Sequence, residues 1–242
     1  MNIFRLVGDG CHILAVFLML YQLEYVKDAT DISILSQELL LITFVLRYLD
    51  IGTHFYSLYN TLVKMFYLWS AVAICAQFKL ARGNIRDTMV ENERIQKSFI
   101  LIVAFIINIA ALPYSFAFGF QGFMWGWSIV LEPAALIPQF VILYENRLRV
   151  PPFVKAYIFL MWIYRVFYIM NWIYRSHYEP YYRPNYFVYF FGALHALTLP
   201  LAVLLNRYKP YEERNSSEDE RGTLTLLDLE QDSYELLNDA ED

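Results

Sequence analysis

The chain has 242 residues, of which 58% are hydrophobic and 18% are charged, and its formal net charge is −5. A typical soluble domain is about 45–50% apolar and about 25% charged. The apolar excess, with a mean hydropathy of +0.35, argues against an ordinary soluble domain and indicates that lipid surrounds most of the chain.

Apolar windows of membrane-spanning length follow one another along the sequence. A helix needs about 20 apolar residues to cross the hydrocarbon layer of a bilayer. Windows of about this length cover residues 3–21, 34–53, 55–78, 98–118, 123–144, 153–174 and 186–205. Arg47, Asp50 and Lys64 interrupt the second and third windows. The windows are mostly apolar all round, whereas a buried helix of a soluble protein keeps a polar face. We therefore predict an all-α membrane protein with seven transmembrane helices.

The N-terminal window has no basic segment before it and no small-residue cleavage site after it. We therefore predict that it stays in the protein as the first transmembrane helix and is not removed as a signal peptide. The two cysteines, Cys11 and Cys75, lie in apolar windows. We predict that both are packing residues without a disulfide.

Basic residues gather in alternate connections between the windows. They are Lys79, Arg82, Arg86, Arg94 and Lys97 after the third window, Arg147, Arg149 and Lys155 after the fifth, and Arg207 and Lys209 after the seventh. Because the basic residues of short loops usually face the cytosol, we predict a lumenal N-terminus and a cytosolic C-terminus.

The composition changes at residue 206. Residues 206–242 hold twelve acidic residues and four basic ones, a net charge of −8, whereas the whole chain is at −5. Residues 1–205 therefore carry a net charge of +3, and the acidic balance belongs to the tail. We predict a transmembrane domain at 1–205 and a disordered, acidic cytosolic tail at 206–242.

A short glutamine motif occurs twice. Ser36-Gln37 opens the second window, and Pro138-Gln139 lies late in the fifth. At equivalent places of two three-helix halves joined by a linker helix, the motif predicts a pseudo-symmetric bundle with its site at the interface of the repeats.

Ionisable side chains inside the windows are expensive in a bilayer and usually face a cavity or a partner. The residues of this kind are Arg5, Asp9, His12, Arg47, Asp50, Lys64, Glu132, Arg165 and Arg175. Helical spacing places Arg5, Asp9 and His12 on one face of the first helix. The sixth helix carries a polar stripe at steps of four, three and four, made of Tyr164, Tyr168, Asn171 and Arg175.

Two interpretations of these charges remain open. They can pair with one another and lock the helices together, which holds above all for Asp9, Asp50, Lys64, Glu132 and Arg165. Arg5, Arg47 and Arg175 lie near the predicted lumenal half, where too few acidic residues are available to neutralise them. Surplus guanidinium groups in a cavity of low dielectric constant favour a carboxylate ligand. We therefore predict an anion-binding cavity that opens to the lumen.

Four long segments of the sequence match a known pattern. They are MNIFRLVGDGCH at the N-terminus, RYLDIGTHFYSLYNTLVKMFY, WSIVLEPAALIPQF and YRVFYIMNWIYRSHYE. These segments resemble the KDEL receptor family, whose members retrieve escaped endoplasmic reticulum proteins from the Golgi. The resemblance covers most of residues 1–180 and fades through the seventh window. It implies a seven-helix fold similar to the PQ-loop and SWEET transporters, in agreement with the predicted repeat.

The resemblance implies a role for individual residues. Arg47 would bind the C-terminal carboxylate of a cargo peptide that ends in Lys-Asp-Glu-Leu or a similar sequence. Arg5 and Arg175 would pair with the two acidic side chains of that peptide. Trp125 would stack on the cation four residues from the peptide end, with Asp50 near its charge.

The resemblance also implies a pH switch at His12, coupled to Tyr164 and Glu132. Protonation of His12 adds positive charge beside the anionic peptide, so binding would strengthen as the pH falls. The alternative is that His12 is an ordinary polar residue with its hydrogen bonds satisfied. The supporting polar side chains of the implied site are Tyr48, Arg165, Tyr168 and Asn171.

The sequence departs from the family in the cation subsite. Gly122 stands where the family usually has an acidic residue, and residues 198–201 lack the aspartate expected in the seventh helix. Both losses weaken the expected preference for lysine at the fourth-from-last cargo position. Histidine or another residue there becomes compatible with the site.

The tail departs furthest from the family, which typically ends in a short lysine cluster. Here residues 232–237, with Asp232, Leu236 and Leu237, fit an acidic dileucine signal, and Tyr234 begins a tyrosine-based one. Clathrin adaptors recognise both kinds of signal. A chance match in an acidic tail that contains leucines is the alternative.

We therefore expect a sorting receptor of the endoplasmic reticulum and Golgi, with an additional post-Golgi or endosomal pool. The expected partners are the C-terminal signal peptide, membrane lipid and a vesicle coat or clathrin adaptor, and not nucleic acid. The alternative function is proton-coupled transport of a small anionic or amino-acid solute. The sequence offers no histidine–carboxylate cluster with metal-ligand spacing and no serine or cysteine beside an obvious base. We therefore expect no enzymatic activity, metal or cofactor.

Overall fold

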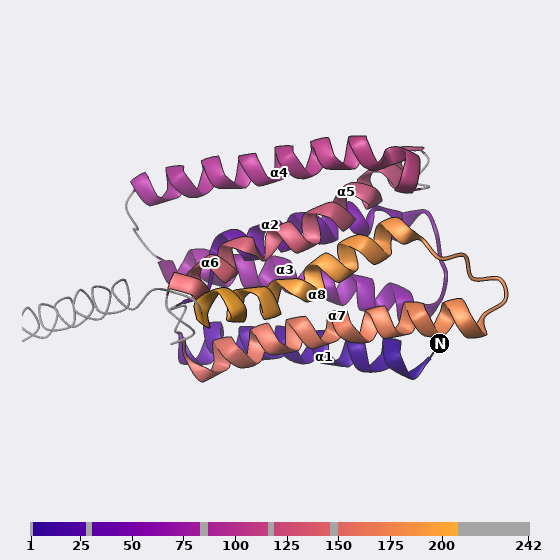
Figure 1. Cartoon of the computed structure of the whole chain (residues 1–242). Helices are drawn as coiled ribbons and strands as arrows, with labels where there is room; N and C mark the ends of the chain where they lie inside the picture. Colours follow the sequence, from indigo (N-terminus) through magenta and orange to yellow (C-terminus); the bar gives the residue numbers. More distant parts are fainter. Residues whose placement is uncertain (1, 28–30, 83–86, 116–118, 146–149, 208–242) are drawn as a thin grey trace, which may run out of the picture. The chain divides into compact units, whose positions relative to one another are not determined.

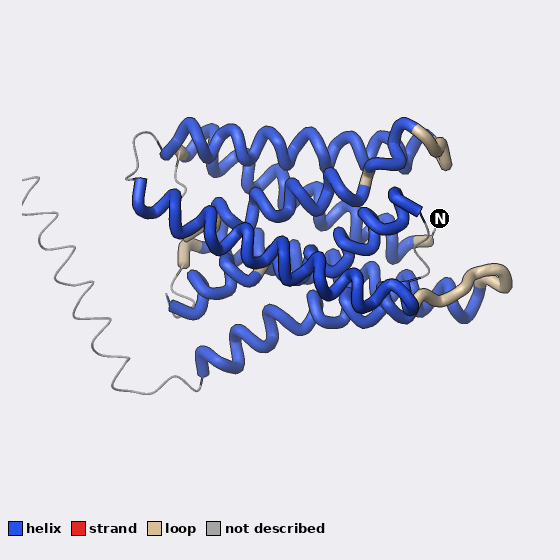
Figure 2. Tube along the Cα trace, turned by 90° about the horizontal axis from the view of Figure 1, so that it is seen from above, coloured by secondary structure: helices blue, strands red, loops and turns tan. Residues whose placement is uncertain are grey.

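The computed structural model describes residues 2–27, 31–82, 87–115, 119–145 and 150–207, and these residues form helices joined by short connections (Figures 1 and 2). The α-helices are α1 (Ile3–Tyr21), α2 (Ile34–Arg47), α3 (Leu58–Arg82), α4 (Asp87–Ser115), α5 (Gly119–Ala135), α6 (Ile137–Glu145), α7 (Pro152–Tyr178) and α8 (Tyr186–Arg207). A π-helical turn, η1 (Gln22–Val26), continues α1, and a 3-10 helix, η2 (Leu49–Gly52), follows α2. The predicted tail signal at Asp232, Tyr234, Leu236 and Leu237 lies outside the described residues.

Among the described residues, six segments are long and apolar enough to cross a membrane. They are Ile3–Val26, Leu58–Phe78, Arg94–Ser115, Gly119–Glu145, Pro152–Tyr178 and Tyr186–Leu205. These segments confirm six of the seven predicted windows and a multi-pass, all-α membrane protein. The window predicted at 34–53 is shorter in the structure, because its α-helix ends at Arg47. Ser33 caps the start of α2 by accepting a hydrogen bond from the backbone N–H of Ser36.

The fifth window consists of two helices with a break at Leu136. Pro138 explains the break, because proline has no N–H for the helical hydrogen bond and its ring clashes with the carbonyl four residues earlier. The break lies where the predicted glutamine motif begins, so it places Gln139 in the first turn of α6.

The helix pairs of the first compact unit, Met1–Val203, follow a crossed pattern (Figure 1). α1 packs against α7, and α2 packs against α5. The first helix of each three-helix half therefore lies beside the second helix of the other half. α4, between the two halves in sequence, packs mainly on α5. This arrangement agrees with two pseudo-symmetric three-helix halves and a linker helix.

The sequence analysis predicted that the two glutamine motifs occupy equivalent places in the two halves. In the structure they lie on α2 and α6, which are not equivalent helices of the two halves, and they contact each other. The Gln139 side chain accepts a hydrogen bond from the Ser33 backbone N–H (2.9 Å), and the Gln139 backbone N–H donates to Ser36 Oγ (3.0 Å). Gln37 donates to the Tyr157 hydroxyl on α7 (3.0 Å). Because buried polar groups need partners, these bonds join α2 to α6 and α7 at the end of the bundle opposite the N-terminus.

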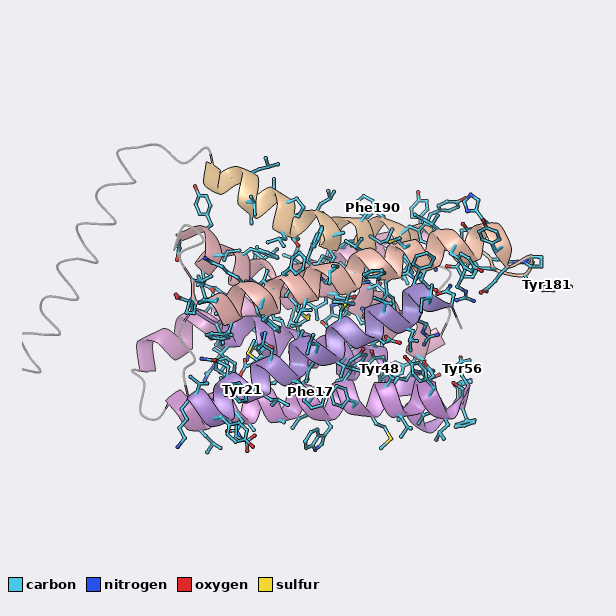
Figure 3. The ribbon with its side chains drawn as sticks, turned by 90° about the horizontal axis from the view of Figure 1, so that it is seen from below. Phe17, Tyr21, Tyr48, Tyr56, Tyr181 and Phe190 are labelled. Carbon is cyan, nitrogen blue, oxygen red and sulfur yellow. The ribbon has the colours of Figure 1, made fainter. Side chains whose placement is uncertain are left out.

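The outer surface of the helices is apolar. Phe17, Tyr21 and Phe190 point outward from their helices (Figure 3), and each is more than half exposed. A soluble monomer rarely exposes apolar side chains over such large areas. Contact with lipid explains this surface.

Candidate functional site

A cavity of about 220 Å³ lies toward the end of the bundle where α1, α3 and α5 begin and α2 and α7 end. Its lining comes from six elements, α1, α2, η2, α3, α5 and α7. The lining residues are Arg5, His12, Phe44, Arg47, Tyr48, Asp50, Asn60, Val63, Lys64, Tyr67, Trp125, Glu132, Tyr164, Arg165 and Tyr168. Side chains that are far apart in the sequence therefore meet in one polar site.

Most of the predicted site residues line this cavity, and two do not. Asn171 is buried and accepts a hydrogen bond from Asn2 Nδ2 (2.8 Å). Arg175 donates through Nε to Glu179 Oε2 (2.7 Å) and stacks on the ring of Tyr182 (4.4 Å to the ring centroid). Burial raises the pKa of the Tyr182 hydroxyl above its ordinary value. A neutral phenol therefore faces the Arg175 guanidinium in the connection between α7 and α8.

Glu132 is shared by two arginines at the base of the cavity. Its Oε2 lies 2.7 Å from Arg47 Nη2, and its Oε1 accepts hydrogen bonds from Arg165 Nη2 and from the Tyr164 hydroxyl (2.5 Å). Arg47 also donates to the Ser128 hydroxyl (3.2 Å) and to the Ser128 carbonyl (3.0 Å). The carboxylate is almost completely buried. Two guanidinium groups thus depend on one negative charge.

Asp9 is surrounded by tyrosine hydroxyls from α3 and α7. Tyr59 donates to its Oδ2 (2.7 Å), Tyr168 donates to its Oδ1, and Tyr67 lies 3.4 Å from Oδ1. Arg5 Nε is 3.8 Å from Oδ2, which is longer than a hydrogen bond. Three hydroxyls therefore share Asp9 with Arg5, which pairs with it only loosely.

Arg5 has one strong contact of its own. Its Nη2 donates to Asn60 Oδ1 (3.0 Å), whereas its buried Nε has no hydrogen-bond partner. A buried guanidinium nitrogen without a partner is costly, so an anion that reached this nitrogen would be stabilised.

Asp50 is already paired within the site. Lys64 Nζ lies 2.6 Å from Asp50 Oδ2 and also stands over the rings of Tyr48 and Tyr56, at 5.8 Å and 5.5 Å from the ring centroids. The carboxylate predicted to face the ligand cation therefore has a resident cation beside it.

The sequence analysis predicted that too few acidic residues are available to neutralise Arg5, Arg47 and Arg175. This prediction was wrong, because each of the three arginines has a carboxylate nearby. Arg47 lies 2.7 Å from Glu132 and Arg175 lies 2.7 Å from Glu179, while Asp9 is close to Arg5. The surplus of positive charge in the lining arises instead because Arg47 and Arg165 share Glu132, and because Asp9, which is close to Arg5, is not a lining residue. The lining has four cationic side chains, Arg5, Arg47, Lys64 and Arg165, and two carboxylates, Asp50 and Glu132.

His12 lies between two tyrosine rings on the wall of the cavity. Its ring centroid is 4.2 Å from that of Tyr67 and 4.6 Å from that of Tyr164, and both pairs are stacked. His12 is 5% exposed. The structure therefore places His12 beside Tyr164, the residue that donates to Glu132.

The sequence analysis missed four lining residues, Phe44, Asn60, Val63 and Tyr67, and named Lys64 only as a charge inside the third window. Asn60, Lys64 and Tyr67 follow one another at steps of four and three, so they share one face of α3. This spacing could have identified them as a polar stripe. Phe44 and Val63 carry no such signal, because an apolar wall residue looks like any other residue of a transmembrane helix.

Comparison with known proteins gives one consistent family. The sequence profile of the family described as ER lumen protein retaining receptor matches residues 28–175. The ER lumen protein-retaining receptor of Petunia hybrida is 37% identical over 182 residues, which cover 75% of this chain and 83% of that protein. Receptor B of Arabidopsis thaliana is also 37% identical, with the same coverage. The receptor of Plasmodium falciparum is 34% identical over 181 residues, 74% of this chain and 80% of that protein.

Substitution of the shared carboxylate is expected to destabilise the bundle. Glu132→Gln leaves Arg47 and Arg165 without their common counter-charge, and breaking a buried ion pair costs about 3–5 kcal/mol. Thermal unfolding of the purified protein in detergent measures this loss.

Glu38→Gln is the matched control for Glu132→Gln. Glu38 Oε2 lies 2.6 Å from Lys97 Nζ, and both side chains are a quarter or more exposed. Such a pair is worth about 0–1 kcal/mol. Equal small shifts of the unfolding temperature in both variants would contradict a major contribution of Glu132 to the stability of the bundle.

Proposed function

Because the chain belongs to the ER lumen protein retaining receptor family, we propose that it is a sorting receptor for C-terminal signals of the Lys-Asp-Glu-Leu or His-Asp-Glu-Leu type. It binds luminal proteins that carry these signals in the acidic Golgi and returns them to the endoplasmic reticulum. The observation that carries the proposal is the cavity in which two guanidinium groups share the Glu132 carboxylate. Among the described residues, no feature favours the alternative of a solute transporter.

Arg47 is the proposed group for the peptide C-terminal carboxylate. Its contacts with Ser128 and Glu132 are made by Nε and Nη2. A guanidinium has five N–H donors, so a second carboxylate can be bound at Nη1 while Ser128 holds the group in place. A charge-assisted pair of this kind is short and strong.

Arg5 and Arg175 are the proposed groups for the two acidic side chains of the signal. Arg5 lines the cavity and pairs only loosely with Asp9. Arg175 stands outside the lining, paired with Glu179, and both side chains are more than a third exposed. An exposed pair is worth about 0–1 kcal/mol, so an acidic side chain of the peptide can replace Glu179 at little cost.

The proposed pH switch is the stack of His12 between Tyr67 and Tyr164. Histidine is the side chain that most readily changes charge between a near-neutral and a mildly acidic compartment. A proton on His12 adds positive charge to a cavity that already has more cations than carboxylates. The anionic peptide then binds more tightly, so affinity rises as the pH falls.

Peptide binding to the purified receptor tests the proposal. A labelled peptide ending in His-Asp-Glu-Leu should bind more tightly at about pH 5.5 than at about pH 7.4, and amidation of its C-terminus should abolish binding. Arg47→Ala should lower the affinity about 10- to 150-fold, the loss expected for hydrogen bonds to a charged group.

Arg94→Ala is the control for charge removal, because Arg94 is exposed on α4 far in sequence from every lining residue. It should leave the affinity unchanged. Absence of binding at both pH values, or binding that is insensitive to amidation, would count against the receptor.

The cation subsite makes a second prediction. Trp125 is present, but Asp50 is paired with Lys64, and Gly122 in the first turn of α5 offers no carboxylate. We therefore expect peptides ending in Lys-Asp-Glu-Leu and His-Asp-Glu-Leu to bind with affinities within about threefold of each other. This ratio corresponds to a difference in binding free energy of about 0.7 kcal/mol, which is less than a hydrogen bond to a charged group contributes. Competition binding measures the ratio.

Gly122→Glu supplies the missing carboxylate, so it should shift the preference toward the lysine peptide. A strong lysine preference of the natural protein, or no shift in Gly122→Glu, would refute this account of the subsite.

We further propose that the cavity opens to the lumen. The cavity lies at the end of the bundle where α1 begins, and the basic residues Arg94, Lys97 and Lys155 lie toward the other ends of α4 and α7. Basic residues near the ends of transmembrane helices favour the cytosolic side. This charge distribution supports the proposal of a lumenal N-terminus and a cytosolic tail at residues 206–242.

The proposed partner of the tail is a clathrin adaptor. Its dileucine at Leu236 and Leu237 follows an acidic residue, Asp232, at the spacing of an acidic dileucine signal. Such a signal would give the receptor a post-Golgi or endosomal pool in addition to its cycle between the Golgi and the endoplasmic reticulum.

Replacement of both leucines by alanine should increase the receptor at the cell surface several-fold, as measured by surface biotinylation of the full-length protein. The same change at Leu226 and Leu227 is a matched control, because Gly222 stands four residues before that pair. Equal effects of the two changes, or no effect of either, would exclude the signal.

A further inference from the structure

One buried histidine has no part in the site as described. His195 lies on α8 and is 1% exposed, and neither of its ring nitrogens has a hydrogen-bond partner. A neutral imidazole has one N–H donor and one acceptor nitrogen. Buried polar groups nearly always have partners, so an imidazole with two unpartnered nitrogens calls for a functional explanation.

The backbone around His195 is held by two hydrogen bonds. Thr198 Oγ1 donates to the His195 carbonyl (2.6 Å), and Trp162 Nε1 on α7 donates to the carbonyl of Ala196 (2.8 Å). The first bond lies within α8, and the second joins α8 to α7. The position of the imidazole is therefore set by the fold, whereas its ring nitrogens keep their hydrogen-bonding capacity.

His195 lies near the shared carboxylate but is not one of the lining residues of the large cavity. Its Nδ1 lies 3.8 Å from Glu132 Oε1, and its ring meets that of Tyr164 edge-on, with 5.9 Å between the centroids. His195 also lines a second, small cavity of about 10 Å³, which is at most the space of one water molecule. A shift of about 1 Å would bring Nδ1 within hydrogen-bond distance of Glu132.

Charged and titratable groups from four helices surround the imidazole. They are His12 on α1, Arg47 on α2, Glu132 on α5, and Tyr157, Tyr164 and Arg165 on α7. Arg47 and Arg165 repel a further positive charge, and Glu132 attracts it. Whether the imidazole binds a proton therefore depends on how strongly Arg47 and Arg165 bind Glu132.

We propose that His195 is a positioning residue for Glu132 and a second proton-binding group of the receptor, coupled to occupancy of Arg47. This inference rests on the proposed function. When the peptide carboxylate binds Arg47 at Nη1, Arg47 interacts with two carboxylates and its attraction for Glu132 weakens, and His195 becomes a further partner of the Glu132 carboxylate.

Proton uptake follows from the charges. The bound peptide adds a negative charge beside Arg47, which favours a protonated imidazole over a neutral one. The proton comes from solvent and leaves when the peptide dissociates. Because linkage between two ligands is reciprocal, a proton that binds better in the presence of peptide makes the peptide bind better at lower pH.

Two variants of the full-length receptor test the inference by peptide binding between pH 5 and pH 8. His195→Gln keeps hydrogen-bonding groups but cannot be protonated. It should bind peptide at pH 7.4 with an affinity within about threefold of the natural protein, and it should lose about tenfold of the gain in affinity at pH 5.5, the change expected for one linked proton. His12→Gln should keep a residual pH dependence, which should disappear when both substitutions are combined.

The outcomes separate this inference from the proposed function. If the natural receptor binds the peptide more tightly in acid and His195→Gln has the same pH profile, the role of His195 is refuted and the receptor stands. Should His12→Gln alone make binding independent of pH, the role of His195 is refuted even where His195→Gln does not fold. If the natural receptor binds no signal peptide at any pH, the proposed function fails and this inference fails with it.

Discussion

The rest of the site depends on one buried carboxylate. Glu132 on α5 binds Arg47 at the end of α2 and Arg165 on α7, and it accepts a further hydrogen bond from Tyr164. In a bilayer, a charge of this kind persists only when partners surround it. The same interaction therefore joins three helices from both halves of the bundle and leaves the cavity with more guanidinium groups than carboxylates.

Asp9 joins α1 to its neighbours α3 and α7, mainly through hydrogen bonds from tyrosine hydroxyls. It is held by hydroxyls of Tyr59 and Tyr168 from α3 and α7, with Arg5 at 3.8 Å. Phenols satisfy a carboxylate without neutralising it, so Arg5 stays available to a second anion. Stability and binding thus use the same charges, because the groups that lock the helices also leave nitrogen donors in the cavity without a matching acceptor.

The sequence was sufficient for the helices and for most of the cavity, because a charge in a transmembrane window is conspicuous and helical spacing shows which charges share a face. It could not show which carboxylate meets which arginine, since the Arg47–Glu132 pair joins residues on α2 and α5 that only the packing brings together. The early end of α2 at Arg47 was missed because the apolar window continues past it. Nothing in the sequence distinguishes His195 from a packing residue, because only the packing of α8 brings its Nδ1 to 3.8 Å from Glu132 Oε1.

Charge matching would account for the selection of a short acidic peptide end by the proposed site. The lining has two more cations than carboxylates. In the proposed complex, a Lys-Asp-Glu-Leu end carries three carboxylates and one cation, so its net charge is negative where that of the lining is positive. Because unpaired charge is so costly where water is scarce, a ligand with fewer anions would leave guanidinium groups uncompensated. In the proposed mechanism, a proton on a histidine beside Glu132 adds positive charge to the cavity, so a lower pH would strengthen binding of the acidic peptide.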